Sequence, residues 1–194
     1  PDLRAARVWF RAMRHDKRSH TLLGAVANEL LQSRIKLIDS TRYIKEHIAH
    51  RGVLTSLQPT QDQTAAIEYA LPIVRRLAEL DIGQSIAVTP QQVVAVEAIE
   101  GTDALLRRCG ELRREGPGGV LVKLKKPRQE ARADLPTIGP DTVAGAKAAG
   151  LRGIAVEAAG TLESAALRET AGSLDFSTFY GRFKIDPTTG RQIG

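Results

Sequence analysis

The chain has 194 residues and a mass of 21.0 kDa, which suits one sizeable domain or one small domain with part of another. Hydrophobic residues make up 42% and charged residues 26%, as in globular proteins, and no apolar run approaches the roughly 18 residues of a membrane-spanning helix. A single cysteine, Cys109, excludes an internal disulfide and fits a reducing compartment.

The net charge of +6 arises near the start of the chain, where residues 1–51 carry 11 Lys and Arg against 5 Asp and Glu. Arg4, Arg7, Arg11 and Arg14 follow at spacings of three and four, so they form one stripe on a helix. Such a stripe fits an anionic membrane surface or a solvated helix face. Nucleic acid is not an expected partner, because the sequence lacks an interleaved aromatic platform and a zinc-finger or helix-turn-helix signature.

Apolar periodicity and turn signals predict the elements of the first half. They are helices over 2–14 and 20–33, a short strand over 35–38, a helix to about residue 50, a connector over 52–59 and a helix over 61–80. Asp39-Ser40-Thr41 is the expected cap of the third helix. Thr60 and Gln63 resemble a capping box for the long helix, which Pro72 should kink or make irregular.

The second half alternates strands with helices. The expected elements are strands over 84–89 and 92–100, a helix over 102–115, a turn over 116–119, a strand over 120–124, an irregular segment over 127–139, a helix over 140–149 and a strand over 153–157. A hairpin is expected around Thr89-Pro90. Lys123 and Lys125 alternate with apolar residues, which predicts a strand with one polar face.

This alternation is typical of α/β folds with a partly parallel sheet. We therefore expect two units, an N-terminal α/β unit and a C-terminal α/β domain with a mixed, partly parallel sheet. The expected divisions are an N-terminal unit over 1–51, a linker and long helix over 52–81, a C-terminal domain over 82–172 and a tail without an assigned role over 173–194.

Four acidic residues lie in or beside turns that follow apolar segments: Glu97, Glu100, Asp103 and Asp134. Gly101 lies between Glu100 and Asp103 and permits close backbone approach. Thr102 or Asp103 should then cap the next helix. The open N–H groups of that helix start form an anion site. A second helix start is expected behind Gly139, because Pro140 suits the first helical position. Two such sites that face each other could hold a diphosphate.

Carboxylates beside a phosphate repel it unless a cation lies between them. At about 4 Å and an effective dielectric of about 20 the repulsion is roughly 4 kcal/mol, whereas a helix terminus returns about 0.3–2 kcal/mol. The acidic cluster therefore predicts Mg²⁺ or Mn²⁺ at a phosphate site. The alternative is plain helix capping by Asp103 and Asp141.

Other polar or reactive residues have simpler explanations. His47 and His50 lie three residues apart, a spacing that metal sites use, but are expected at the surface. Cys109 lies on an apolar helix face and is expected in the core. The lysines of segment 123–126 either balance substrate phosphate or form a solvated strand face.

Several long stretches are distinctive: DIGQSIAV (81–88), VVAVEAIEGTDALLRRCGEL (93–112), GGVLVKLKKPRQEARADLPTIGPDTV (118–143) and AGLRGIAVEA (149–158). Together with PDLRAARVWF (1–10) and KLIDSTRYI (36–44), they make the chain resemble the bacterial UDP-2,3-diacylglucosamine pyrophosphatases of the LpxI type over about residues 1–160. These are metal-dependent enzymes of lipid A synthesis. Segment 162–194 does not resemble the usual end of that family, and its members begin with a further stretch of N-terminal domain, so this chain is expected to begin inside that domain.

The resemblance implies a two-domain enzyme in which residues 82–172 form the catalytic domain. It implies hydrolysis of UDP-2,3-diacylglucosamine to UMP and 2,3-diacylglucosamine 1-phosphate (lipid X), by water attack at the α-phosphorus with a divalent ion assisting. The family's essential aspartate maps to Asp134 of DLPTIGPDT, with Asp141 as the less favoured match. The implied location is cytoplasmic, peripheral to the inner membrane, which favours the basic stripe as a membrane contact.

These arguments assign Asp134 as the catalytic residue and a metal ligand, with Glu97, Glu100 and Asp103 completing the metal shell. Lys123 should offset charge on the leaving phosphate, and the substrate contacts are expected from Gln84, Ser85, Gly101, Thr102, Lys123, Thr137, Gly139, Asp141 and Thr142. Two other functions stay open: a non-catalytic module that binds a nucleotide-sugar lipid, and a purely structural domain.

Overall fold

The computed structural model describes residues 6, 8, 10, 19–112, 118–127, 134–170, 179–185 and 192–193. They fall into two compact units, residues 1–45 with 128–135 (unit one) and residues 46–127 with 136–194 (unit two). No helix within the described ranges is long and apolar enough to cross a bilayer. The expected helix over 2–14 falls almost wholly outside the described residues, as do all four arginines of the basic stripe.

Unit one contains α2 (Ser19–Gln32), which confirms the helix predicted over 20–33. Arg34 has a left-handed φ of 62°, just after the helix ends. The strand predicted over 35–38 is wrong: this segment has no strand partner among the described residues, and Ile35 and Ile38 are exposed. Without a neighbouring strand its backbone cannot form a ladder.

Asp39 is a cap, as predicted, because its carboxylate accepts a hydrogen bond from Thr41 N at 2.9 Å. The helix predicted to run to His50 is wrong, since only the short 3₁₀ helices η1 (Ser40–Tyr43) and η2 (Lys45–His47) follow. The next residues instead pair with a segment that is distant in the sequence. Ile48 forms a bridge with Leu162, and Ala49 N donates to Thr161 O at 2.9 Å.

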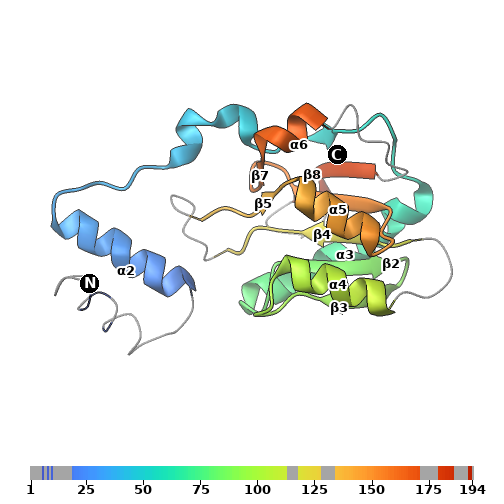
Figure 1. The fold of residues 1–194 in the computed structure, drawn as a ribbon, viewed down its shortest axis with the longest axis horizontal. Coiled ribbons are helices and arrows are strands. Elements are labelled where there is room, and N and C mark those ends of the chain that lie inside the picture. The colour runs from blue at the N-terminus through green and yellow to red at the C-terminus, as the bar shows by residue number, and fades with distance from the viewer. Residues whose placement is uncertain are drawn as a thin grey trace. The chain divides into compact units, whose positions relative to one another are not determined.

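Unit two is built on a mixed sheet with the strand order β1-β8-β6-β4-β2-β3, and β9 pairs with β8 (Figure 1). The strands are β1 (Gly52–Val53), β2 (Ser85–Thr89), β3 (Gln92–Val96), β4 (Val120–Lys123), β6 (Gly153–Glu157), β8 (Phe179–Ile185) and β9 (Gln192–Ile193). β4, β6 and β8 are parallel, whereas β2 is antiparallel to both β3 and β4. The expected hairpin and the expected mixed, partly parallel sheet are confirmed.

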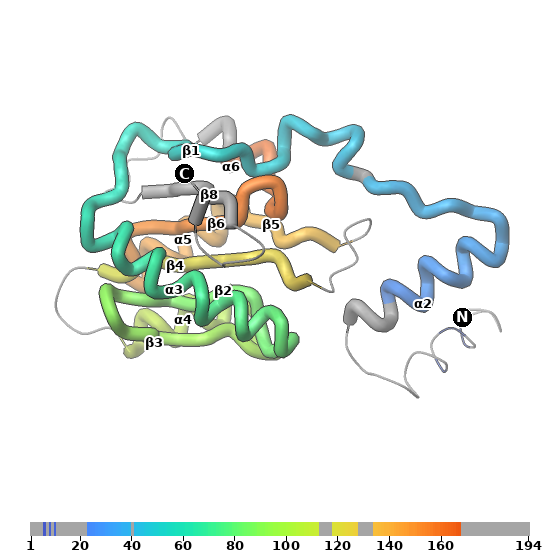
Figure 2. Tube along the Cα trace, turned by 180° about the vertical axis from the view of Figure 1, so that it is seen from behind, coloured from blue at the N-terminus to red at the C-terminus, as the bar shows by residue number. Residues whose placement is uncertain are grey.

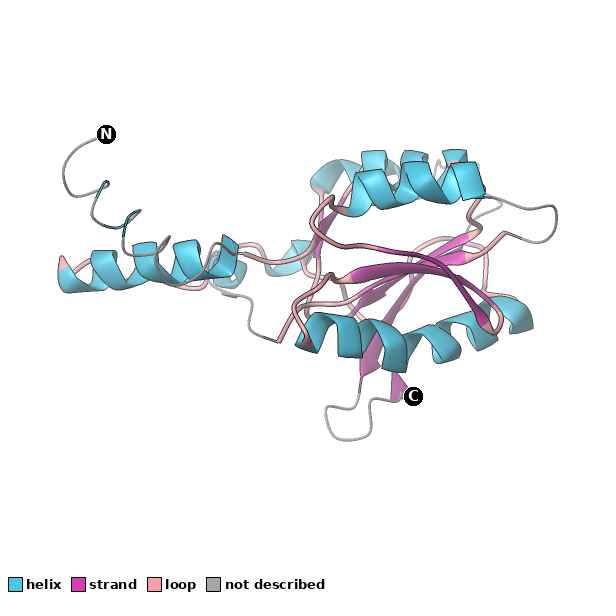
Figure 3. Ribbon diagram, turned by 90° about the horizontal axis from the view of Figure 1, so that it is seen from below, coloured by secondary structure: helices cyan, strands magenta, loops and turns pink. Residues whose placement is uncertain are grey.

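Helices cover both faces of this sheet. α3 (Gln61–Glu79) packs on β2 and β4 from one side, and α4 (Thr102–Leu112) with α5 (Pro140–Ala148) covers the other side (Figures 2 and 3). Val120 and Val122 of β4 pack in the α3 core, and Leu121 packs in the core with α4 and α5. All residues of β4 are buried, so the polar face predicted for this strand is wrong. The cause is its central place in a two-sided sheet.

Strands also appear where the sequence analysis expected none, among them β5 (Thr137–Ile138) and β8. β5 lies in the segment expected to be irregular and pairs in parallel with β7 (Leu162–Glu163), which α6 (Ala165–Thr170) follows. β8 comes from the tail over 173–194 and extends the sheet beside β6.

The capping box of α3 is confirmed. Thr60 Oγ1 accepts from Gln63 N at 3.3 Å, and Gln63 Oε1 accepts from Thr60 N at 2.7 Å. Gln63 Nε2 also donates to Arg152 O at 3.0 Å, which ties the helix start to the loop before β6. α3 contains Pro72 within its assigned bounds and is a layer of unit two.

We expect Thr60→Ala to lower the free energy of unfolding by about 0.5–2 kcal/mol, because it leaves the Gln63 N–H without its acceptor. Urea unfolding followed by circular dichroism measures the change. Thr64→Ala is the matched control, since the Thr64 hydroxyl bonds the Thr60 carbonyl without capping a free N–H. Equal losses for the two variants would contradict the cap's contribution.

Candidate functional site

The candidate site lies at one edge of the sheet in unit two. Because β2 is antiparallel to both neighbours, β3 and β4 run in the same direction and end at the same edge. α4 begins shortly after β3, and β5 leads into α5. The carboxyl ends of parallel strands are where open α/β sheets bind ligands.

A row of three polar residues crosses this edge. Ser85 is the register partner of Lys123, and Glu97 N donates to Ser85 O at 2.9 Å, so the three residues lie side by side on adjacent strands or strand ends. Strand alternation puts them on the face covered by α4 and α5. Ser85 is 1% exposed, and Glu97 and Lys123 are each 6% exposed. We call these residues the polar row.

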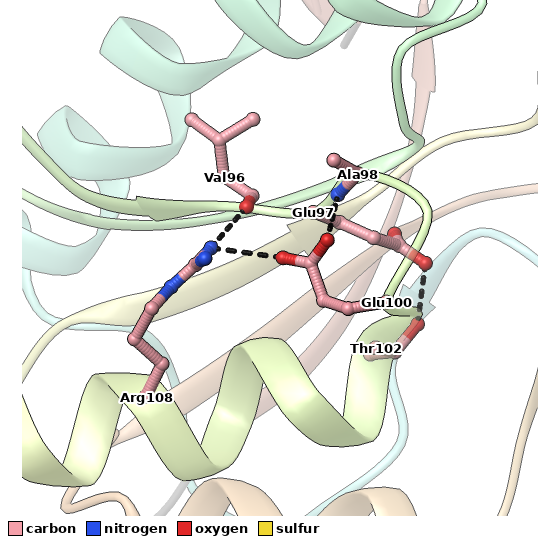
Figure 4. A network of polar contacts seen from close by, with 6 residues as sticks. All are labelled: Val96, Glu97, Ala98, Glu100, Thr102 and Arg108. Atoms are coloured by element: carbon pink, nitrogen blue, oxygen red, sulfur yellow. Dashed lines mark hydrogen bonds and ion pairs between the residues drawn. The ribbon is translucent and has the colours of Figure 1, made fainter.

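Thr102, the first residue of α4, joins the two charged ends of the polar row. Lys123 Nζ donates to Thr102 Oγ1 at 3.0 Å. Thr102 Oγ1 in turn donates to Glu97 Oε1 at 3.1 Å (Figure 4). This direction is the one open to an ionised pair, since an ammonium only donates, a carboxylate only accepts and a hydroxyl has one proton. Lys123 Nζ also donates to Thr137 O of β5 at 3.4 Å.

The electrostatics of the polar row follow from its burial. Desolvation lowers the pKa of Lys123, and the carboxylates of Glu97 and then Asp103 oppose this shift. Two acceptors, Glu97 Oε2 and Ser85 Oγ, are buried without a hydrogen-bond partner among the described residues. Buried polar atoms of this kind call for an explanation.

Both expected helix starts exist, with glycine at the cap position. Gly101 has φ +81° and accepts from Leu105 N at 3.1 Å, so Thr102 and Asp103 lie inside α4, and the prediction that one of them caps it is wrong. Gly139 caps α5 without a side-chain hydrogen bond, and Pro140 takes the first helical position, as predicted. Glycine has no side chain with which to cap these helices, so their first backbone N–H groups can bind an anion.

The expected metal shell is not brought together. Glu100 turns away from the polar row: its carboxylate accepts from Ala98 N at 3.1 Å and pairs with Arg108 at 3.0 Å, and Arg108 also donates to Val96 O (Figure 4). Asp103 is exposed on α4. In the described part of the chain, no three His, Cys, Asp or Glu side chains form a group that could hold a metal ion.

A divalent ion held jointly by Glu97, Glu100 and Asp103 therefore does not fit these residues. The Lys123 ammonium already supplies positive charge beside Glu97. The remaining expected ligand, Asp134, belongs to unit one, is half-buried and lies in no helix or strand.

The other expected substrate contacts are distributed along the same elements. Gln84 precedes β2, its carbonyl accepts from Leu124 N at 2.9 Å, and its Oε1 is buried without a partner among the described residues. Thr137 and Asp141 are exposed and Thr142 is half-buried, at and after the strand that leads into α5. The structure thus joins Ser85, Glu97, Thr102, Lys123 and Thr137, and leaves Asp141 and Thr142 at the α5 start.

The sequence analysis missed Glu157, the last residue of β6. Its Oε2 accepts from Lys125 N at 2.9 Å, and it lines a cavity of about 250 Å³ with Arg75, Leu124 and Lys126. The signal was the one used for Glu97, an acidic residue at the end of an apolar strand. Lys126 also pairs with Asp81 at 2.9 Å.

The residues given simpler explanations differ in outcome. Cys109 is buried in the core, as predicted, and burial raises the pKa of its thiol, opposed by Arg108. His50 is exposed, as predicted, whereas His47 is half-buried with its Nδ1 buried.

Residues 50–173 match the family model of the LpxI C-terminal domain. The chain is also 41% identical over 148 residues to a protein of Caulobacter vibrioides named UDP-2,3-diacylglucosamine pyrophosphatase LpxI. That alignment covers 73% of this chain and 53% of the relative, so the chain spans about half the length of the curated relative it matches.

We expect Lys123 to make the free energy of unfolding rise with pH between its lowered folded-state pKa and its ordinary value of 10.5. In that window the unfolded chain holds a proton that the folded chain has released, so raising the pH favours the folded state, by about 1.36 kcal/mol for each pH unit between the two pKa values. Lys123→Met should remove this rise. Urea unfolding at a series of pH values measures this rise. The control is Lys147→Met, which changes an exposed lysine of α5. Parallel profiles for wild type and Lys123→Met would contradict the expectation.

Proposed function

The chain belongs to the LpxI family, and we propose on that premise that it hydrolyses the diphosphate of UDP-2,3-diacylglucosamine to UMP and 2,3-diacylglucosamine 1-phosphate. The observation that carries the proposal is the family match over residues 50–173, which spans every candidate site residue from Gln84 to Thr142. The substrate is the one in the name of the Caulobacter relative.

The geometry of the sheet edge supports a diphosphate ligand. Lys123 Nζ donates both to the first residue of α4 and to the strand that leads into α5. An ammonium thus lies at the start of α4 and beside the strand that precedes α5, and a helix start favours negative charge by about 0.3–2 kcal/mol. This combination suits a ligand with two linked phosphates.

We propose that Asp134 orients the water that attacks the α-phosphorus. Asp134 is the residue to which the family's essential aspartate maps, and it precedes Thr137 by three residues. In this reaction the oxygen of water becomes part of UMP, and the sugar 1-phosphate leaves as an anion, so no general acid is required. Lys123 would offset charge on the departing phosphate.

Two further features stay predictions of the resemblance. Mg²⁺ or Mn²⁺ would supply Lewis-acid assistance when bound, but the described carboxylates do not complete a shell for it, so we assign no step to the cation. Action at the cytoplasmic face of the inner membrane would use the basic stripe, whose arginines lie outside the described residues.

We expect the chain to release UMP from UDP-2,3-diacylglucosamine, and in ¹⁸O-labelled water to place the label on the UMP phosphorus. Phosphorus NMR detects both outcomes, because ¹⁸O shifts the resonance of the atom that carries it. Parallel reactions contain Mg²⁺, Mn²⁺ or a chelator, and a reaction without protein is the control. Label on the sugar phosphate would contradict attack at the α-phosphorus. Thermal stabilisation by the substrate without UMP release would instead indicate a binding module.

We expect Asp134→Ala to lower kcat by about 10²–10⁴-fold or more, because water loses its orienting group. Circular dichroism should remain that of the wild type. Asp141→Asn tests the less favoured match and should cost less than Asp134→Asn. Near-normal hydrolysis by Asp134→Ala with added Mg²⁺ or Mn²⁺ would remove Asp134 from the mechanism.

A further inference from the structure

Glu97 has an environment that its expected role as a metal ligand does not explain. It is 6% exposed, and its Oε1 accepts from the hydroxyl of Thr102 at 3.1 Å. A buried carboxylate is unfavourable unless it is paired and hydrogen-bonded. Among the described charged groups, Glu97 and Asp103 act on Lys123, and only Glu97 is connected to it by hydrogen bonds through a shared residue.

The hydrogen bonds decide which groups can still reach a ligand. The single proton of the Thr102 hydroxyl is donated to Glu97, so this hydroxyl cannot also donate to a phosphate. The Lys123 ammonium has three N–H donors, of which Thr102 and Thr137 accept two. Among the described residues Lys123 has no third hydrogen-bond acceptor, so one of its donors stays available to a ligand. The ammonium lies just beneath the surface, since Thr102 is half-buried and Thr137 is exposed.

The other carboxylate oxygen of Glu97 is an open acceptor beside the start of α4. Glu97 Oε2 is buried and has no hydrogen-bond partner among the described residues, and the Glu97 side chain reaches toward Thr102 at the first turn of the helix (Figure 4). The open N–H groups of that turn, the free donor of Lys123 and this oxygen occupy one small region. A carboxylate oxygen only accepts, so an ordered donor such as a water molecule, and not a phosphate oxygen, would complete its hydrogen bonding.

We propose that Glu97 is a positioning residue that, through the hydroxyl of Thr102, fixes the ammonium of Lys123 as a donor to the diphosphate of the substrate. This inference rests on the proposed function. A lysine side chain has four rotatable carbon bonds, and a donor held in place before the reaction costs no reorganisation when charge develops. Glu97 then contributes to catalysis only through Thr102, and does not contact the substrate or a metal ion.

A double-mutant cycle tests this dependence, with UMP release as the measured reaction. Glu97→Gln keeps the shape of the side chain and removes its charge, whereas Thr102→Val keeps the shape and removes the hydroxyl. We expect each single variant to lower kcat by about 10-fold or more with a smaller change in KM, and the double variant to be no worse than Thr102→Val. Thr102→Ser should restore most of the activity because it keeps the hydroxyl.

Two results would overturn the proposal. One is additive losses in the double variant, which would mean that Glu97 acts independently of Thr102. The other is a Glu97→Gln variant whose main defect is a higher Mg²⁺ or Mn²⁺ concentration for half-maximal rate, as expected of a metal ligand. Glu111→Gln, an exposed glutamate on α4, is the matched control and should retain wild-type rates. Thermal melting verifies that each variant folds, and Thr102→Ala replaces Thr102→Val where the latter does not.

A failure of the proposed function has a different signature. In that case the wild-type chain releases no UMP. The double-mutant cycle is then measured by calorimetry, as the change in the Kd for UDP in each variant. Non-additive losses of UDP affinity would support the positioning of Lys123 for a diphosphate. Additive losses, or unchanged affinity in both single variants, would overturn it.

Discussion

The structure of the site depends on how the buried ammonium of Lys123 is satisfied. β4 is covered on both faces, so a lysine at its end cannot simply extend into water as it would on a one-sided sheet. Its acceptors are Thr102 Oγ1 and Thr137 O, which belong to the segments that begin α4 and lead into α5. The bonds that stabilise the lysine therefore also connect the start of α4 with the strand that precedes α5. The same hydrogen bonds therefore stabilise the buried lysine and determine the geometry of the site.

The topology explains why the charged residues of the polar row meet although they lie far apart in the sequence. β2 runs antiparallel between β3 and β4, which gives β3 and β4 the same direction and brings Glu97 and Lys123 to one edge. The backbones at Gly83 and Glu97 approach each other closely at this edge, because a Cβ on Gly83 would lie 1.9 Å from Glu97 O. A side chain at Gly83 would push the end of β3 away from the start of β2 and disturb the row.

Local signals in the sequence predicted the elements that local physics determines. The Thr60 capping box, the Asp39 cap, Pro140 and the periodicity of α2 and α4 act within a few residues of themselves. The errors concern residues whose structure depends on distant partners. Segment 35–38 has no strand neighbour in the part of the chain that the structure describes, β8 needs β6, and the apparent polar face of β4 is covered by α4 and α5. In the site, Glu97, Glu100 and Asp103 were grouped because they are close in sequence. The turn at residues 99 and 100 separates them, and Arg108 holds Glu100 elsewhere.

This separation changes the charge balance of the site. Three clustered carboxylates would need a divalent cation before any phosphate approached, whereas Glu97 beside Lys123 is close to neutral and leaves the fields of two helix starts for the ligand. Those fields contribute only about 0.3–2 kcal/mol each, too little to hold a diphosphate tightly. On the proposed function, most of the affinity must therefore come from parts of the substrate remote from the phosphates. Acyl chains can supply it, since each buried CH₂ contributes about 0.8 kcal/mol. If remote groups supply the binding energy, the charged groups of the site can be used to stabilise the transition state. An oriented Lys123 would have its effect at that stage of the reaction.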